Sequence, residues 1–295
     1  MGKGVLMPTE SSASAISGRT PRSVKVDRTE LDSYGCHEPS VYRLADPTRR
    51  YASTMSEPTT TEPADAGGAA GSAALQDPTY RHAVVDLLGA LAYSELSAFE
   101  RLAEDSKMAP TLEDKAAVAS MASAEFAHFA CLRDRLAELG TDPVNAMEPF
   151  QDPVDAFHTH TRPADWLEGL IKAYVGDGLA ADFYREIAAF LDADTRALVL
   201  ETLADTGHSE FAVDRVRKAI ETDPRVAGRL ALWARRLMGE ALSQAQLVAA
   251  ERDALSALLA GGVDRPGMDL AAIGRMFARL TENHTGRMSA LGLQA

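Results

Sequence analysis

Four stretches of nearly equal length carry apolar residues at spacings of three and four: 77–104, 111–139, 163–191 and 194–221. Such spacing places the apolar side chains on one face of an α-helix. The ends of the stretches also carry helix signals, with Asp77 before Pro78 as a start and Gly140 as a stop. The chain is therefore predicted to be all-α.

The connections between these helices differ in length, and this difference predicts their arrangement. Short loops join the first helix to the second and the third to the fourth, which makes each pair antiparallel. Residues 140–162 form a connection long enough to run the length of one pair and begin the next from the other end. Two antiparallel pairs with one long crossover predict a four-helix bundle of ferritin-like connectivity.

Three regions are expected along the chain. Residues 77–222 form the bundle. Residues 223–295 hold two additional C-terminal helices, which would pack on the bundle or against a second copy of the chain in a homo-oligomer. Residues 1–76 are rich in Ser, Thr, Pro, Gly and Ala without apolar periodicity, which predicts a disordered tail. Met55 resembles a translation start, in which case residues 1–54 precede the true one.

Composition restricts the partners and the compartment. The 295 residues carry a formal net charge of −13, which disfavours nucleic acid because its phosphates are repelled. The two cysteines form no disulfide framework, and the N-terminus lacks the apolar core of a signal peptide. No uncharged apolar run approaches the ~18 residues that a membrane span requires. We therefore expect a cytoplasmic protein without a membrane segment.

Each predicted bundle helix places an acid among the apolar residues of its inner face. The second and fourth helices add a histidine three residues after the acid, so both side chains share that face. These groups lie near the midpoints of their helices, where a bundle would bring them to one level: Glu95, Glu125, His128, Asp177, Asp205 and His208. A lone Glu-x-x-His pair is usually an ion pair, but four helices with matched positions favour a common site.

The chemistry of this site follows from charge. Four ionised carboxylates in a dry core repel one another and lose their hydration. Two divalent cations would remove this conflict, and carboxylates with two imidazoles suit iron or manganese. On the third helix, Asp182 is an alternative to Asp177, because a bulge at Gly176 and Gly178 would turn it inward. The same glycines leave room either for O₂ or substrate or for close helix packing.

These six residues, at this spacing, resemble the ligand set of the ferritin-like carboxylate di-iron superfamily. Within that superfamily, residues 80–220 are similar to the tRNA isopentenyladenosine hydroxylase-like branch. The resemblance implies a centre of two iron ions that activates O₂ and hydroxylates an organic substrate. Asp177 and Asp205 stand where the family has glutamate, which leaves the identity and the binding strength of the second metal open.

Three functional interpretations remain. The first is a non-haem di-iron hydroxylase or mono-oxygenase that uses O₂, a small-molecule substrate and an electron donor that the sequence does not identify; manganese or a mixed metal pair would also fit. The second is a ferritin-like iron oxidase or peroxide scavenger, although the chain carries no cysteine-rich rubredoxin unit. The third is a helical scaffold with a degenerate metal site.

Overall fold

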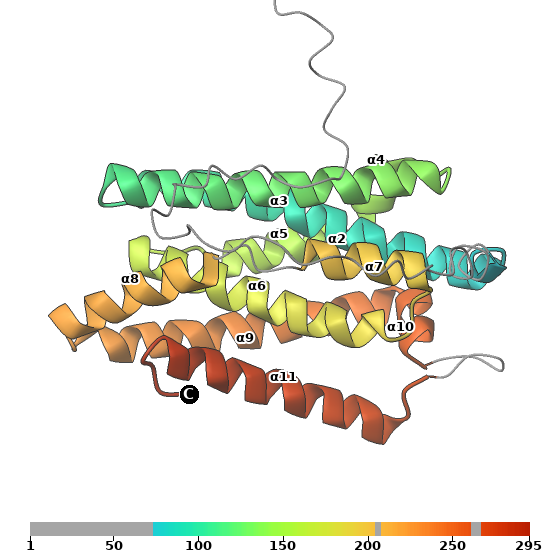
Figure 1. The fold of residues 1–295 in the computed structure, drawn as a ribbon. Helices are drawn as coiled ribbons and strands as arrows, with labels where there is room; N and C mark the ends of the chain where they lie inside the picture. The colour runs from blue at the N-terminus through green and yellow to red at the C-terminus, as the bar shows by residue number, and fades with distance from the viewer. Residues whose placement is uncertain (1–72, 204–207, 261–266) are drawn as a thin grey trace, which may run out of the picture. The chain divides into compact units, whose positions relative to one another are not determined.

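The computed structural model describes residues 73–203, 208–260 and 267–295, all within one compact unit, Ser56–Ala295. These residues form helices and turns without a strand, which confirms the all-α prediction (Figure 1). None of the described helices combines the length and the apolar character of a membrane span. The predicted tail over 1–76 lies outside the described residues except for 73–76, of which Ala74 and Leu75 pack against the core.

The first pair of helices agrees closely with its prediction. Helix α2 (Pro78–Asp105) begins where the Asp77 side chain accepts hydrogen bonds from two backbone N–H groups. Helix α3 (Leu112–Glu138) begins at Thr111, whose hydroxyl oxygen accepts from the backbone N–H of Asp114. A 3-10 turn, η2 (Ser106–Met108), connects them, and α2 and α3 then pack along one another.

The predicted crossover at 140–162 is helical over much of its length. It contains α4 (Pro143–Met147), η3 (Glu148–Phe150) and α5 (Gln151–His160). These pieces are too short to show a helical period in the sequence. Helix α4 lies so close to α2 that a Cβ on Gly89 would be 2.2 Å from the backbone oxygen of Ala146. Glycine at this position therefore permits the contact.

The second pair differs from its prediction in one respect. Helix α6 (Trp166–Ala188) lies within the predicted third helix and begins at Asp165, whose side chain caps it. The predicted fourth helix is two helices, α7 (Ala193–Thr202) and α8 (His208–Thr222), both of which contact α6. Residues 204–207, between them, lie outside the described part of the chain.

In the part of the chain that the structure describes, three helices follow the bundle where two were predicted. They are α9 (Val226–Glu251), α10 (Asp253–Ala260) and α11 (Leu270–Ala290). The helix breaks at Arg252, where φ is −119° and ψ is 84°, and the Arg252 guanidinium donates a hydrogen bond of 3.1 Å to Asp86 on α2. Helices α9 and α11 contact α6, whereas α10 contacts α2.

Within the described residues, two clusters of buried apolar side chains lie along the bundle. On α2 the change from one cluster to the other falls within residues 93–101, and on α3 within 123–128. On α6 it falls within residues 180–186. Glu95 and Glu125 lie inside these intervals, whereas Asp177 does not. The two glutamates therefore lie where one apolar cluster gives way to the other.

Candidate metal centre

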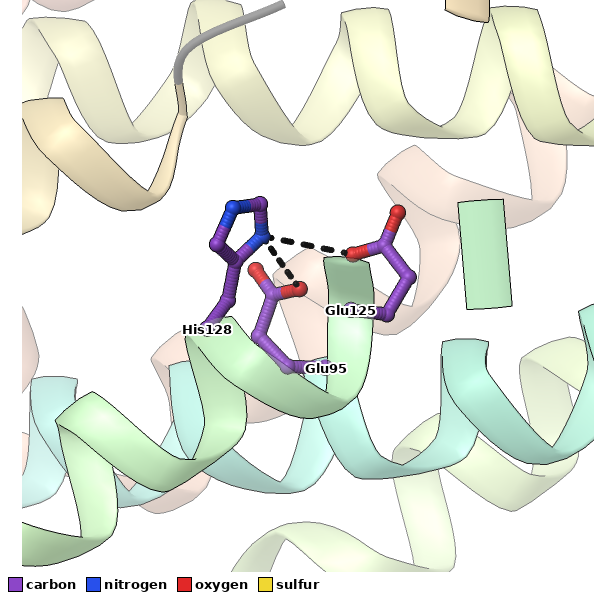
Figure 2. A group of neighbouring side chains, drawn as sticks. All are labelled: Glu95, Glu125 and His128. Carbon is purple, nitrogen blue, oxygen red and sulfur yellow. Dashed lines mark ion pairs between the residues drawn. The ribbon is translucent and has the colours of Figure 1, made fainter. Parts of the chain in front are cut away.

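Two adjacent helices bring three of the six predicted ligands together. Glu95 extends from α2, and Glu125 and His128 extend from α3 toward it (Figure 2). The Nδ1 atom of His128 lies 3.6 Å from Oε2 of Glu95 and 3.6 Å from Oε2 of Glu125. One potential ligand atom from each of the three residues lies within 4.8 Å of the other two.

The local sequence explains this convergence. Glu125 and His128 are three residues apart, so they share one face of α3, and the antiparallel α2 presents Glu95 to that face. Both glutamates are buried, each at 9% exposure. The His128 side chain is 21% exposed, so the imidazole forms the side of the site that is nearest to solvent.

The polar atoms of these three side chains are not fully hydrogen-bonded by one another. At 3.6 Å neither carboxylate is within hydrogen-bond distance of His128, and its buried Nδ1 has no hydrogen-bond partner among the described residues. Burial and the Glu95 carboxylate raise the pKa of Glu125 to about 7, against the lowering effect of His128. Burial alone would lower the pKa of His128, but Glu125 and Glu95 raise it to about 10. These shifts have the direction expected of like charges gathered around one positive group.

Comparison with the other buried acids sets this site apart. Five acidic side chains are buried within the described part of the chain: Asp86, Glu95, Asp114, Glu125 and Glu168. Three of them form an ion pair with an arginine: Asp86 with Arg252, Asp114 with Arg215, and Glu168 with Arg229. Glu95 and Glu125 form no such pair there, and His128 is their basic neighbour. The negative charge of Glu95 and Glu125 is therefore available to a bound metal cation.

Helix α6 brings neither of its two candidate acids into this group. Asp177 was predicted on the buried face of the helix, but the structure places it on the exposed side. Asp182 accepts a hydrogen bond of 2.6 Å from Nη1 of Arg287 and lies 3.6 Å from Nη1 of Arg185. A Cβ on Gly178 would be 2.6 Å from Cδ of Arg287, so this glycine makes room for the arginine. At Gly178, close packing is the explanation.

Tyr184, on α6, was not predicted from the sequence to belong to the site. Burial raises its pKa to about 12, with a lowering contribution from a hydrogen bond with Ser94 and a raising contribution from Glu95. Tyr184 lies within residues 180–186 of α6, between the two apolar clusters of buried residues, and is coupled electrostatically to Glu95. No signal in the sequence distinguishes such a tyrosine from an ordinary core aromatic.

The fourth predicted helix contributes residues that the structure does not describe. Asp205 lies within the undescribed residues 204–207. His208 begins α8, but its side chain is outside the described part. Their assignment as ligands stays a prediction.

Comparison with known proteins gives one finding. A family model described as a ferritin-like domain of actinomycetes matches residues 78–262, more than half of the chain. The match extends from α2 into the segment that follows α10, and so includes Glu95, Glu125 and His128. A comparison with curated proteins gives no match.

Proposed function

Because the chain belongs to the ferritin-like domain family of actinomycetes, we propose that it binds iron or manganese at Glu95, Glu125 and His128. The observation that carries the proposal is the pair of buried glutamates that lack an arginine or lysine partner within the described residues and face an imidazole. Every other buried acid in that part of the chain has such a partner.

The donor set fits a transition metal. Two carboxylates and one imidazole form the mixed oxygen and nitrogen environment that suits iron and manganese. A divalent cation would displace the proton that His128 holds at neutral pH, so that Nδ1, which has no hydrogen-bond partner among the described residues, becomes a ligand atom beside Glu95 and Glu125. The neighbouring apolar clusters would keep the carboxylates in place and limit the access of water.

We also propose that the centre holds a second metal ion. A second metal would use Asp205 and His208, since Asp177 is exposed and Asp182 is held by Arg287. The α2–α3 site should therefore bind its metal more tightly than the second site. Tyr184, protonated at neutral pH because its pKa is about 12, would orient the Glu95 carboxylate.

The reaction class follows from the metal and the family. A bound iron pair would supply a reducible centre for O₂, and we propose hydroxylation of a small organic substrate as the outcome. The tRNA hydroxylase-like resemblance is part of this proposal, although the net charge of −13 favours a small molecule over tRNA. Iron oxidation or peroxide removal is the alternative for the same residues.

Metal stoichiometry tests the binding proposal. Full-length protein is loaded with Fe²⁺ or Mn²⁺, desalted and analysed for metal, alongside Glu125→Ala, His128→Ala and two controls. Glu125→Ala and His128→Ala should lose most of the bound metal. The controls, Asp177→Ala and the exposed Glu100→Ala, should retain it. Wild type that binds neither metal, or a loss in Asp177→Ala equal to that in Glu125→Ala, would overturn the assignment.

Oxygen uptake tests the reaction class. Iron-loaded protein with a reductant should consume O₂ faster when a hydroxylatable organic substrate is present. Uptake that depends only on added Fe²⁺, with no organic product, would assign the protein to iron oxidation instead. Sub-micromolar, salt-sensitive binding of tRNA would favour the tRNA hydroxylase-like form of the proposal over the small-molecule form.

A further inference from the structure

A buried lysine lies away from the metal centre, on α6. Lys172 is 7% exposed, and it forms no ion pair within 4.0 Å among the residues that the structure describes. Its Nζ lies 5.5 Å from the centroid of the Phe157 ring, a cation–π contact with α5. An ammonium group removed from water needs further compensation, because a ring face replaces only part of its hydration.

Two more basic side chains, each on another helix, interact electrostatically with this lysine. They are Arg101 on α2 and His158 on α5, whose ring centroid is 5.3 Å from that of Phe157. Nε of Arg101 and Nδ1 of His158 are buried and have no hydrogen-bond partner within the described residues. Burial, followed by the charges of Lys172 and Arg101, lowers the pKa of His158 to about 3, so its ring is neutral at pH 7.

The acids near this cluster do not balance it. Asp105 on α2 acts on Lys172 electrostatically but does not form an ion pair with it within 4.0 Å. Burial raises the pKa of Asp105 to about 6, although Lys172 lowers it. Glu104 lies 3.7 Å from Arg101 on the solvent side, where its own side chain is 54% exposed. Two cations thus share one partly buried carboxylate.

Solvent can reach this cluster from one side. The Arg101 side chain is 40% exposed, whereas Lys172 is buried. We propose that Arg101, Lys172 and His158 bind a small oxyanion, of which inorganic phosphate is the simplest. The two cations would compensate its charge, and the unpartnered Nε of Arg101 and Nδ1 of His158 would donate hydrogen bonds to its oxygens.

This site is separate from the metal centre. Arg101 is six residues beyond Glu95 on α2, which corresponds to about 9 Å along the helix axis. An anion there would not need a metal for its binding. The site is also unusual for this chain, because a protein with a net charge of −13 repels anions unless basic groups gather locally.

Calorimetric titration with inorganic phosphate tests the inference. Full-length, chelator-treated protein at pH 7 is titrated with phosphate, sulfate and acetate, with chloride maintaining a constant ionic strength. We expect saturable phosphate binding that weakens at least tenfold in Lys172→Met, which replaces the ammonium by an apolar side chain of similar length. Arg101→Gln should weaken it as well. Lys107→Met, an exposed lysine in the neighbouring η2, is the control for net charge and should bind as the wild type does.

The outcomes separate the alternatives. Tighter binding of acetate than of phosphate, still lost in Lys172→Met, supports the site and assigns it to a carboxylate ligand. No saturable binding of any of the three anions, or equal binding in wild type and Lys172→Met, overturns the proposal. Glu125→Ala should keep its phosphate binding; a loss confined to that variant would place the anion at the metal centre and also overturn the proposal.

Discussion

The acids of α6 and those at the α2–α3 contact have opposite surroundings. On α6, Asp182 and Glu186 each accept hydrogen bonds from an arginine of α11. Glu95 and Glu125 lie close to each other and to His128, without an arginine or lysine pair in the described part of the chain. Both groups are carboxylates on amphipathic helices, and only their neighbours differ.

This difference gives a criterion that distinguishes a structural acid from a candidate metal ligand. A carboxylate that is paired with a buried arginine has its charge compensated, and a cation would have to displace the arginine to bind. Two buried carboxylates without such a pair keep their charge available. The C-terminal helices decide which case applies on α6, because α11 supplies Arg287 and Arg279.

The largest effect is expected from breaking the buried pair on α6. Asp182→Ala should lower the free energy of unfolding by about 3 kcal/mol, because it leaves the buried Arg287 guanidinium without its carboxylate. Urea denaturation at pH 7 measures this loss. The control is Glu186→Ala on the same helix, whose exposed partner Arg279 should limit the loss to about 1 kcal/mol or less. Equal losses would show that Asp182 is not a structural acid.

A second large effect concerns the packing that supports Glu95. Gly89→Ala should destabilise the protein by about 2 kcal/mol, because the new Cβ would be 2.2 Å from the backbone oxygen of Ala146 and α4 would have to move away from α2. Chemical denaturation gives the value, and metal binding should weaken if Glu95 shifts with the helix. An unchanged unfolding midpoint would mean that the α2–α4 contact is looser than the structure places it.

A third prediction compares the pH dependence of an unpaired acid with that of a paired one. Burial raises the pKa of Asp105 to about 6, so its contribution to stability falls as pH rises from about 4 to 6. Burial alone would also raise the pKa of Asp114, but Arg215 and Thr111 hold it below its ordinary value, so its contribution is lost as pH falls.

Melting temperatures at pH 4 and pH 7 measure both effects. Asp105→Asn should stabilise the protein at pH 7 and have less effect at pH 4. Asp114→Asn should destabilise it at pH 7, with a smaller loss at low pH. The same pH trend in both variants would remove the distinction between acids with and without an arginine.

The smallest effect is expected at a glycine of α6. Gly176→Ala should stabilise the protein by about 1 kcal/mol, because alanine is the better helix former and no heavy atom lies within 4 Å of the new Cβ. Thermal unfolding of the metal-free protein tests this gain, with Gly178→Ala beside Arg287 as the comparison that should gain less. A loss of stability in Gly176→Ala would show that the space beside this residue is needed.

The sequence by itself determined α2 and α3 and the three candidate ligands that meet between them. Apolar spacing and capping residues placed the ends of α2 and α3 within about three residues of those observed. Glu125 and His128 were predictable because a spacing of three on one helix fixes their common face. The position of Glu95 opposite these two residues was predictable because the short loop between α2 and α3 makes the two helices antiparallel neighbours.

The tertiary structure decided the role of each acid on α6. Periodicity gives the face of a helix only approximately, so it placed Asp177 inward, whereas the structure leaves it exposed. Asp182 is held by Arg287, which is 105 residues away in the sequence. The influence of Glu95 on the pKa of Tyr184 depends on the packing of α6 against α2. Local patterns reflect backbone geometry within a few residues, whereas the charge available at a buried carboxylate depends on distant side chains that only folding brings near it.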